Sequence, residues 1–146
     1  MHSTNITNAN IQRIDDFSKT NLRISLSKFK NLQEYDNLLI IQSTIENSIK
    51  LSIYPIHKER IIKVSLCGLK LTKKILKEIS KILHKFQVIH TSGFIKIKKQ
   101  IFYECYLNLN LLDKKSMDLK TSLEKIKKIF KQIKIEEIGL NNNRDS

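Results

Sequence analysis

The chain has 146 residues, of which 40% are hydrophobic and 28% charged, and its formal net charge is +13. This length suits one globular domain, and the sequence has no apolar run of about 18 residues that would indicate a membrane span. The polar N-terminus lacks the basic and apolar segments of a secretory signal. We therefore expect a cytoplasmic protein with no membrane partner, in which Cys67 and Cys105 are reduced thiols.

The positive charge comes from lysine rather than from arginine. The sequence has 23 lysines but four arginines, and it is rich in Ile and Asn while it holds one Pro and three Gly. Residues with AT-rich codons are enriched, so part of the lysine excess reflects codon usage. Arginine offers the planar fork that suits phosphate and base edges, whereas lysine is a hydrated point charge. Nucleic acid is therefore kept as an alternative partner and not as the first expectation.

Both ends of the chain are polar. Residues 1–20 are rich in Ser, Thr and Asn, and we expect a flexible tail there, although Ile11, Ile14 and Phe17 are spaced for one helical turn. Residues 141–146 are expected to form a second polar tail.

About three strands are predicted in residues 22–56. Apolar residues alternate from Leu22 to Leu26, which indicates a strand. A continuous apolar run followed by a second alternation predicts a hairpin over residues 38–56, which Pro55 is expected to end because proline cannot donate to a strand ladder.

A strand and a helix follow. Apolar residues at every second position from Ile62 to Leu66 predict the strand, and Gly68 ends it. Thr72 is a suitable N-cap. The helix after it has an apolar stripe at helical spacing, made by Ile75, Ile79, Ile82, Leu83 and Phe86.

The rest of the chain predicts a second hairpin, a second helix and a last strand. The hairpin covers residues 88–109, with a bulge or a kink at Gly93. Residues 113–116 are expected to be a loop, and Asp118 is expected to cap the second helix. Its apolar stripe is Leu119, Leu123, Ile126 and Phe130, and Ile133, Ile135 and Ile138 form the last strand.

The order of these elements predicts the fold class. Residues 61–140 read as β-α-β-β-α-β, the ferredoxin-like split pattern. We expect a single α+β domain over residues 21–140, with an antiparallel sheet and this ferredoxin-like half. The strands of residues 22–56 are expected either to extend that sheet or to cover its open face.

In length and in the order of strands and helices, residues 61–140 resemble the ACT domain, a small regulatory module that often binds amino acids. In that family the turn after the first strand lies next to the ligand. The resemblance places a ligand at Gly68, Leu69 and Lys70, of which Gly68 matches the family pattern while its acidic residue and Pro-Gly pair are missing here. It implies a non-catalytic sensor that pairs as a homodimer.

No metal site, cofactor site or catalytic set is predicted. The spacings between Cys67, His84, His90 and Cys105 match no compact zinc pattern. A base that could activate Cys67 cannot be named. Both cysteines are therefore interpreted as structural, and no enzymatic activity is expected.

The sheet face carries the alternative function. Lys96 and Lys98 are expected to share the face opposite the helices with Phe102 and Tyr106. Aromatic and basic residues interleaved on a ferredoxin-like sheet are typical of RNA-recognition motifs, where bases stack on strand aromatics. The first hypothesis is an ACT-like regulatory module for a small molecule such as an amino acid, and the alternative is an RNA-binding or ribonucleoprotein component.

Overall fold

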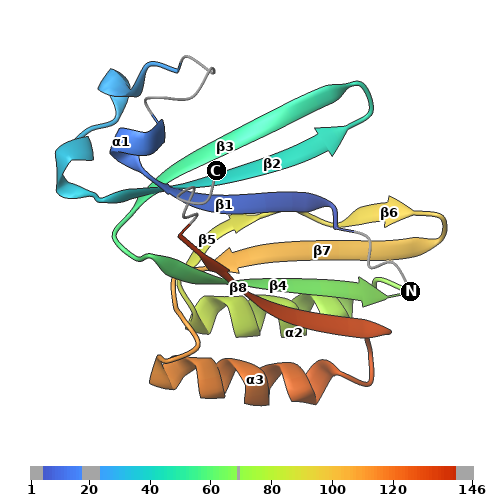
Figure 1. Cartoon of the computed structure of the whole chain (residues 1–146). Coiled ribbons are helices and arrows are strands. Elements are labelled where there is room, and N and C mark those ends of the chain that lie inside the picture. Colours follow the sequence, from blue (N-terminus) through green and yellow to red (C-terminus); the bar gives the residue numbers. More distant parts are fainter. Residues whose placement is uncertain (1–4, 18–23, 69, 141–146) are drawn as a thin grey trace. The chain divides into compact units, whose positions relative to one another are not determined.

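The computed structural model describes residues 5–17, 24–68 and 70–140. The chain divides into two compact units, Met1–Arg60 with Ile138–Ser146 (unit 1) and Ile61–Glu137 (unit 2). The described residues form an α+β fold of three helices and eight strands in two antiparallel sheets (Figure 1). The boundary before Ile61 coincides with the start of the expected β-α-β-β-α-β half.

Unit 1 contains a three-stranded sheet. Its strands are β1 (Thr7–Arg13), β2 (Asn37–Ile45) and β3 (Ser48–Ile56), and the order is β1-β2-β3 with both pairs antiparallel. The predicted hairpin over residues 38–56 is confirmed. Pro55 lies inside β3 instead of ending it, because β3 is an edge strand of this sheet and an edge tolerates a missing N–H.

The prediction of a tail over residues 1–20 is wrong for the described part. Residues 7–13 form β1, and Ile14–Phe17 form the short helix α1. Ile11 is fully buried opposite Leu39, and Phe17 is buried against the β2 side chains. A few apolar anchors therefore order a segment whose composition is polar. Residues 1–4 and 18–20, and the C-terminal tail at 141–146, lie outside the described residues.

The predicted strand from Leu22 to Leu26 is also wrong where it is described. Leu26–Lys28 form one 3-10 turn, η1, and Leu32–Glu34 form a second, η2, while Leu22 lies outside the described residues. Leu26 and Leu32 pack against the buried cluster of Phe17, Leu38 and Ile40. Of the described residues in this alternation, Leu26 is thus an anchor of an irregular segment, whereas Ile24 is exposed.

Unit 2 is built on the five-stranded sheet. Its strands are β4 (Arg60–Gly68), β5 (Val88–Thr91), β6 (Ile95–Ile97), β7 (Gln100–Leu107) and β8 (Gln132–Gly139). The first residue of β4 and the last two residues of β8 are assigned to unit 1. The order is β5-β7-β4-β8, and β6 also pairs with β7. The kink predicted at Gly93 is confirmed, because this residue has a φ of +72° and separates β5 from β6.

Two helices cover one face of this sheet (Figure 1). Helix α2 (Lys73–Lys85) begins at the predicted cap, where the Thr72 hydroxyl accepts a hydrogen bond from the Ile75 N–H at 3.2 Å. Helix α3 (Lys114–Ile126) begins earlier than predicted, with Asp113 and not Asp118 at the N-cap position. Residues 114–116 are therefore helical rather than part of a loop.

The core of unit 2 follows the sequence pattern closely. Tyr103, Cys105 and Leu107 of β7 point toward the helices, as their alternation predicts. They pack with buried side chains of both helices, namely Ile75, Ile79, Ile82, Phe86, Leu119, Leu123 and Ile126. In the described part of the chain, no helix is both long and apolar enough to cross a membrane.

Candidate functional site

At the end of β4, a side chain of the protein itself lies against Gly68. A Cβ atom added to Gly68 would lie 3.1 Å from Cδ1 of Phe130, which is tighter than ordinary van der Waals contact. The glycine therefore lets the Phe130 ring pack against the backbone. Lys70 is exposed, and Leu69 lies outside the described residues.

The sheet residues of the RNA alternative are not brought together on one face. Ile95 pairs with Phe102, and Lys96 pairs with Ile101. Because directly paired residues share a face, Lys96 lies on the face opposite to Phe102. Lys98 lies in the turn, and Tyr106 is fully buried. The grouping expected from simple alternation is wrong, because the two-residue turn at Lys98 and Lys99 pairs Ile97 with Gln100 and so sets the register of β6.

Tyr106 belongs instead to a buried polar cluster within unit 2. The Lys63 ammonium lies 3.2 Å from Oε1 of Glu104, and both side chains are at most 4% exposed. The same ammonium lies 5.8 Å from the centre of the Tyr106 ring, in the range of a cation–π contact. The His90 ring is tilted against Tyr106 at 6.1 Å. These side chains therefore contact one another in the interior of unit 2.

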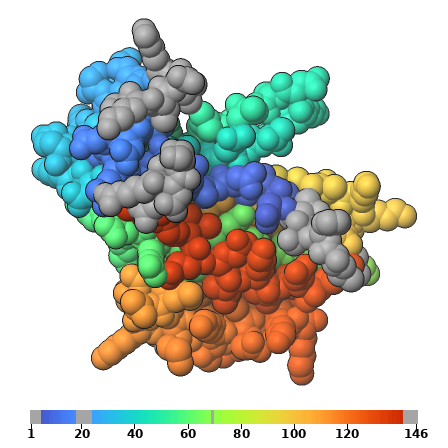
Figure 2. All heavy atoms as spheres, viewed as in Figure 1, coloured from blue at the N-terminus to red at the C-terminus, as the bar shows by residue number. Residues whose placement is uncertain are grey.

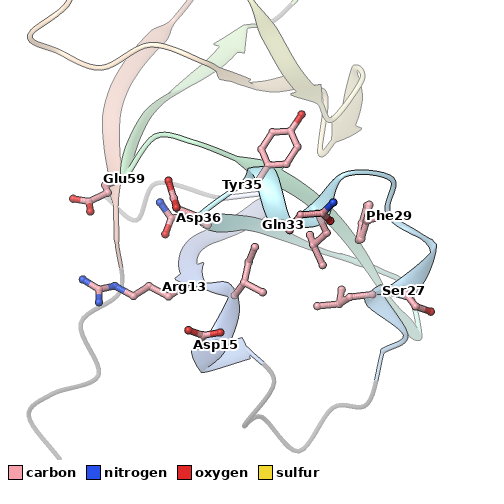
Figure 3. A pocket seen from close by; sticks show the side chains of 12 residues that line it. Arg13, Asp15, Ser27, Phe29, Gln33, Tyr35, Asp36 and Glu59 are labelled. Carbon is pink, nitrogen blue, oxygen red and sulfur yellow. The ribbon is translucent and has the colours of Figure 1, made fainter.

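The candidate functional site is a hollow of about 770 Å³ that is lined by residues of unit 1 (Figure 3). Its wall is made by the end of β1, the start of α1, the η1–η2 segment, the start of β2 and the loop after β3. The lining residues are Arg13, Ile14, Asp15, Leu26, Ser27, Phe29, Leu32, Gln33, Tyr35, Asp36, Asn37 and Glu59.

Charged side chains gather on one side of this hollow. Arg13, Asp36 and Glu59 lie near one another in Figure 3, with Asp15 below them. Backbone hydrogen bonding joins two of the segments that carry them, since the Ile14 N–H donates to the Asp36 carbonyl at 3.3 Å. With one cation and three carboxylates, this side has a formal charge of −2.

The other side of the hollow is apolar. Ile14, Leu26, Phe29 and Leu32 line it and are partly buried. Three of them, Ile14, Leu26 and Leu32, also pack against the small core of unit 1. The floor of the hollow is thus continuous with packed structure, which holds these side chains in place.

Two contacts hold the loop that carries Glu59. The amide of Asn37, which is itself buried, donates to the Lys58 carbonyl at 3.2 Å. The rings of Tyr35 and His57 stack with their centres 4.5 Å apart. The first contact joins the start of β2 to the loop after β3, and the second joins the segment before β2 to the same loop. These contacts hold the backbone next to Glu59.

The two thiols lie elsewhere, in unit 2. Burial is the main cause that raises the pKa of Cys105 to about 12, so this thiol stays protonated at neutral pH. The Cys67 thiol donates to Oε1 of Gln100 at 3.5 Å. Among residues 5–17, 24–68 and 70–140, no group of three or more His, Cys, Asp or Glu side chains could hold a metal ion.

Sequence reasoning missed all four charged residues of the hollow. Arg13 and Asp15 fell in the expected tail, and Asp36 and Glu59 fell in connections between strands. The helical spacing of Ile11, Ile14 and Phe17 is the signal that could have placed the first two in ordered structure. The sequence matches no protein-family model and no curated protein.

Proposed function

We propose that the chain is a non-catalytic regulatory module whose unit 2 has a ferredoxin-like, ACT-type fold. The strand order β5-β7-β4-β8 with both long helices on one face supports this assignment. Read in chain order, with β5 and β6 as one kinked strand, the elements follow the split β-α-β-β-α-β arrangement. The ACT resemblance in turn supports a sensor of a small molecule that works as a homodimer.

The ligand that the hollow suits best is an amino acid with an apolar side chain. One observation carries this proposal: Arg13 and three carboxylates stand beside an apolar floor in one hollow. A guanidinium pairs with a carboxylate, and the carboxylates can pair with an ammonium group. The volume of the hollow lies in the range of small-ligand pockets, about 300–1,000 Å³. We prefer this hollow to the turn at Gly68–Lys70 because the Phe130 ring packs against Gly68.

Binding would join segments that are distant in the sequence. The residues of the hollow come from positions 13–15, 26–37 and 59. A ligand that contacts all three segments stabilises the arrangement in which they meet, and so shifts the population toward it. This differential affinity is the regulatory step that we propose.

A thermal-shift screen of the full chain against the twenty amino acids tests the proposal. A ligand at about 100 times its Kd adds roughly 2.7 kcal/mol, which raises the Tm by several degrees. The variants Arg13→Gln and Asp36→Asn should abolish the shift. Asp16→Asn, an exposed α1 carboxylate that does not line the hollow, should keep it.

Each outcome of the screen is decisive. A shift with Leu, Ile, Val or Phe that is lost in the two hollow variants and kept in the control supports the proposal. The absence of any shift across the panel contradicts amino-acid binding. A shift that survives both hollow variants means that the ligand binds at another place.

A further inference from the structure

The net charge of the protein is concentrated in unit 2. Residues 61–137 hold 18 lysines and no arginine but seven acidic residues, a formal charge of +11 out of the total of +13. The remaining residues, which include the acidic hollow, contribute +2. Codon usage alone would spread the lysines along the chain, so this concentration in one unit calls for a physical explanation.

The seven acidic residues of unit 2 are too few to neutralise its 18 lysines, and most of them contact one neighbouring group. Glu104 binds the buried Lys63, and Glu137 and Asp113 accept hydrogen bonds from backbone N–H groups. Glu78, Glu124 and Glu136 each pair with one neighbouring lysine. In the described part of unit 2, the other 14 lysines are exposed and have no ion pair.

Ten of these free lysines lie in or just after the two helices, on the solvent side. On α2, Lys73 and Lys77 are one turn apart, and the buried stripe of this helix lies on its other side. On α3, Lys125 lies on the side opposite to Leu123, and Lys128 follows shortly after the end of this helix. We call this set the lysine surface, and its members are Lys73, Lys74, Lys77, Lys85, Lys114, Lys115, Lys120, Lys125, Lys128 and Lys131.

The two helices present this charge over one continuous layer. They contact each other and cover the same face of the sheet (Figure 1). The α3 part of the layer, together with β8, forms the orange-to-red surface in Figure 2. Each helix has 13 residues and is therefore about 20 Å long, which is enough to meet several phosphates of one polymer.

The chemistry of the lysine surface favours a nucleic acid over the other polyanionic partners. Protein–protein interfaces are depleted in lysine and enriched in arginine and aromatic residues, and unit 2 has no arginine. An anionic membrane would be met by a contiguous apolar face, whereas the large apolar side chains exposed within α2 and α3 are the separate Leu76 and Met117.

We propose that the lysine surface of α2 and α3 binds the phosphate backbone of a nucleic acid independently of its sequence. Lysine binds phosphate as a point charge, and contacts to phosphate supply affinity but carry no sequence information. This function is separate from the hollow of unit 1 and does not depend on it. It also differs from the RNA-binding alternative of the sequence analysis, because it requires no stacking of bases on Tyr106, which is fully buried.

The test compares two variants that remove equal charge. The helix variant is K73Q/K77Q/K125Q/K128Q, and the control is K50Q/K96Q/K98N/K99G, whose four lysines are also exposed but lie on strand β3 and the β6–β7 hairpin. The probe is a fluorescent 20-base-pair duplex, as DNA and as RNA, titrated with the full chain from about 50 to 200 mM salt, a range over which phosphate contacts weaken strongly.

We expect the unmodified chain to bind both duplexes. A plot of the logarithm of the association constant against the logarithm of the salt concentration should have a slope of about −0.9 for each phosphate contact. The helix variant should bind at least about tenfold more weakly, with the salt slope reduced by about 3, while the control stays within about threefold. Equal losses in the two variants, or no binding at 50 mM salt, would overturn the proposal. Binding to vesicles with anionic lipid but to neither duplex would assign the surface to a membrane instead.

Discussion

Gly68 shows how a single residue can be explained by packing where a ligand was expected. The Phe130 ring lies 3.1 Å from the position that a Cβ atom would take, and Phe130 is itself buried in the core of unit 2. The ring has little freedom to move away, because protein cores are closely packed.

Gly68→Ala should therefore lower the free energy of unfolding by about 1–3 kcal/mol, the usual range for overpacking. Urea unfolding of both proteins measures the change. The same substitution in a Phe130→Leu background should cost much less, because the smaller side chain makes room. An alanine variant as stable as the original chain would contradict the packing account.

A second residue-scale prediction concerns the buried ion pair of unit 2. Glu104→Gln leaves the Lys63 ammonium, 4% exposed, without its carboxylate, and we expect a loss of about 3–5 kcal/mol in unfolding free energy. The control is Glu124→Gln, which breaks an exposed pair with Lys127 and should change stability by less than about 1 kcal/mol. Similar effects of the two substitutions would show that burial of the pair contributes little.

Cys105 predicts how stability depends on alkaline pH. Burial raises its pKa in the folded state from the ordinary value of 9.0 to about 12. Between these values the unfolded chain loses the proton first, so stability is full below pH 9 and falls as pH rises toward 12. Burial also raises the pKa of Tyr103 from 10.0 to about 12, and this residue acts in the same direction. The free energy of unfolding, measured at pH 8, 9, 10 and 11, should fall less steeply with pH in Cys105→Ala than in the unmodified chain. An unchanged dependence on pH would contradict the role given to Cys105.

At the scale of elements, the β6–β7 hairpin is built on an unfavourable turn. Lys98 and Lys99 have φ values of 48° and 66° between the paired residues Ile97 and Gln100. Two-residue turns of this type favour Asn-Gly, because both positions need positive φ. Lys98→Asn with Lys99→Gly should therefore raise the unfolding free energy by about 1–2 kcal/mol, which thermal unfolding can measure. No gain in Tm would mean that the lysines adopt this turn without strain.

The elements that the sequence predicted correctly are those with a strong period. Helix α2 and strand β7 have regular apolar spacing, and Thr72 marks the start of the helix. The start of α3 was misplaced because Lys114 and Lys115 look like loop residues, although lysine is a good helix former and both side chains face solvent. The strand expected up to Leu26 was wrong because Leu26 belongs to a 3-10 turn, whose packing depends on β2, a partner distant in sequence.

The candidate site could not be predicted for the same reason. Arg13, Asp36 and Glu59 meet only after β1 and β3 have paired with β2. Nothing in their spacing along the chain indicates that they share a hollow. The Gly68 turn was chosen by resemblance, and the structural reason for its glycine, the Phe130 ring, lies 62 positions further along the sequence.

At the scale of the whole molecule, the two units differ in the partners that their charges suit. Unit 1 holds a hollow whose charged side has a formal charge of −2, which suits a ligand with an ammonium group. Unit 2 carries +11 with most of its acidic side chains engaged locally, which suits a polyanion. One chain would thus bind a small molecule and a nucleic acid at separate places.

Binding of an amino acid in the hollow of unit 1 is best tested by a ¹H–¹⁵N NMR titration of the full chain with leucine, because this experiment locates the ligand residue by residue. We expect the amide shifts to cluster at residues 13–15, 26–37 and 59, which contain the lining of the hollow. Spectra that do not change, or shifts confined to the Gly68 turn and α2, would contradict it.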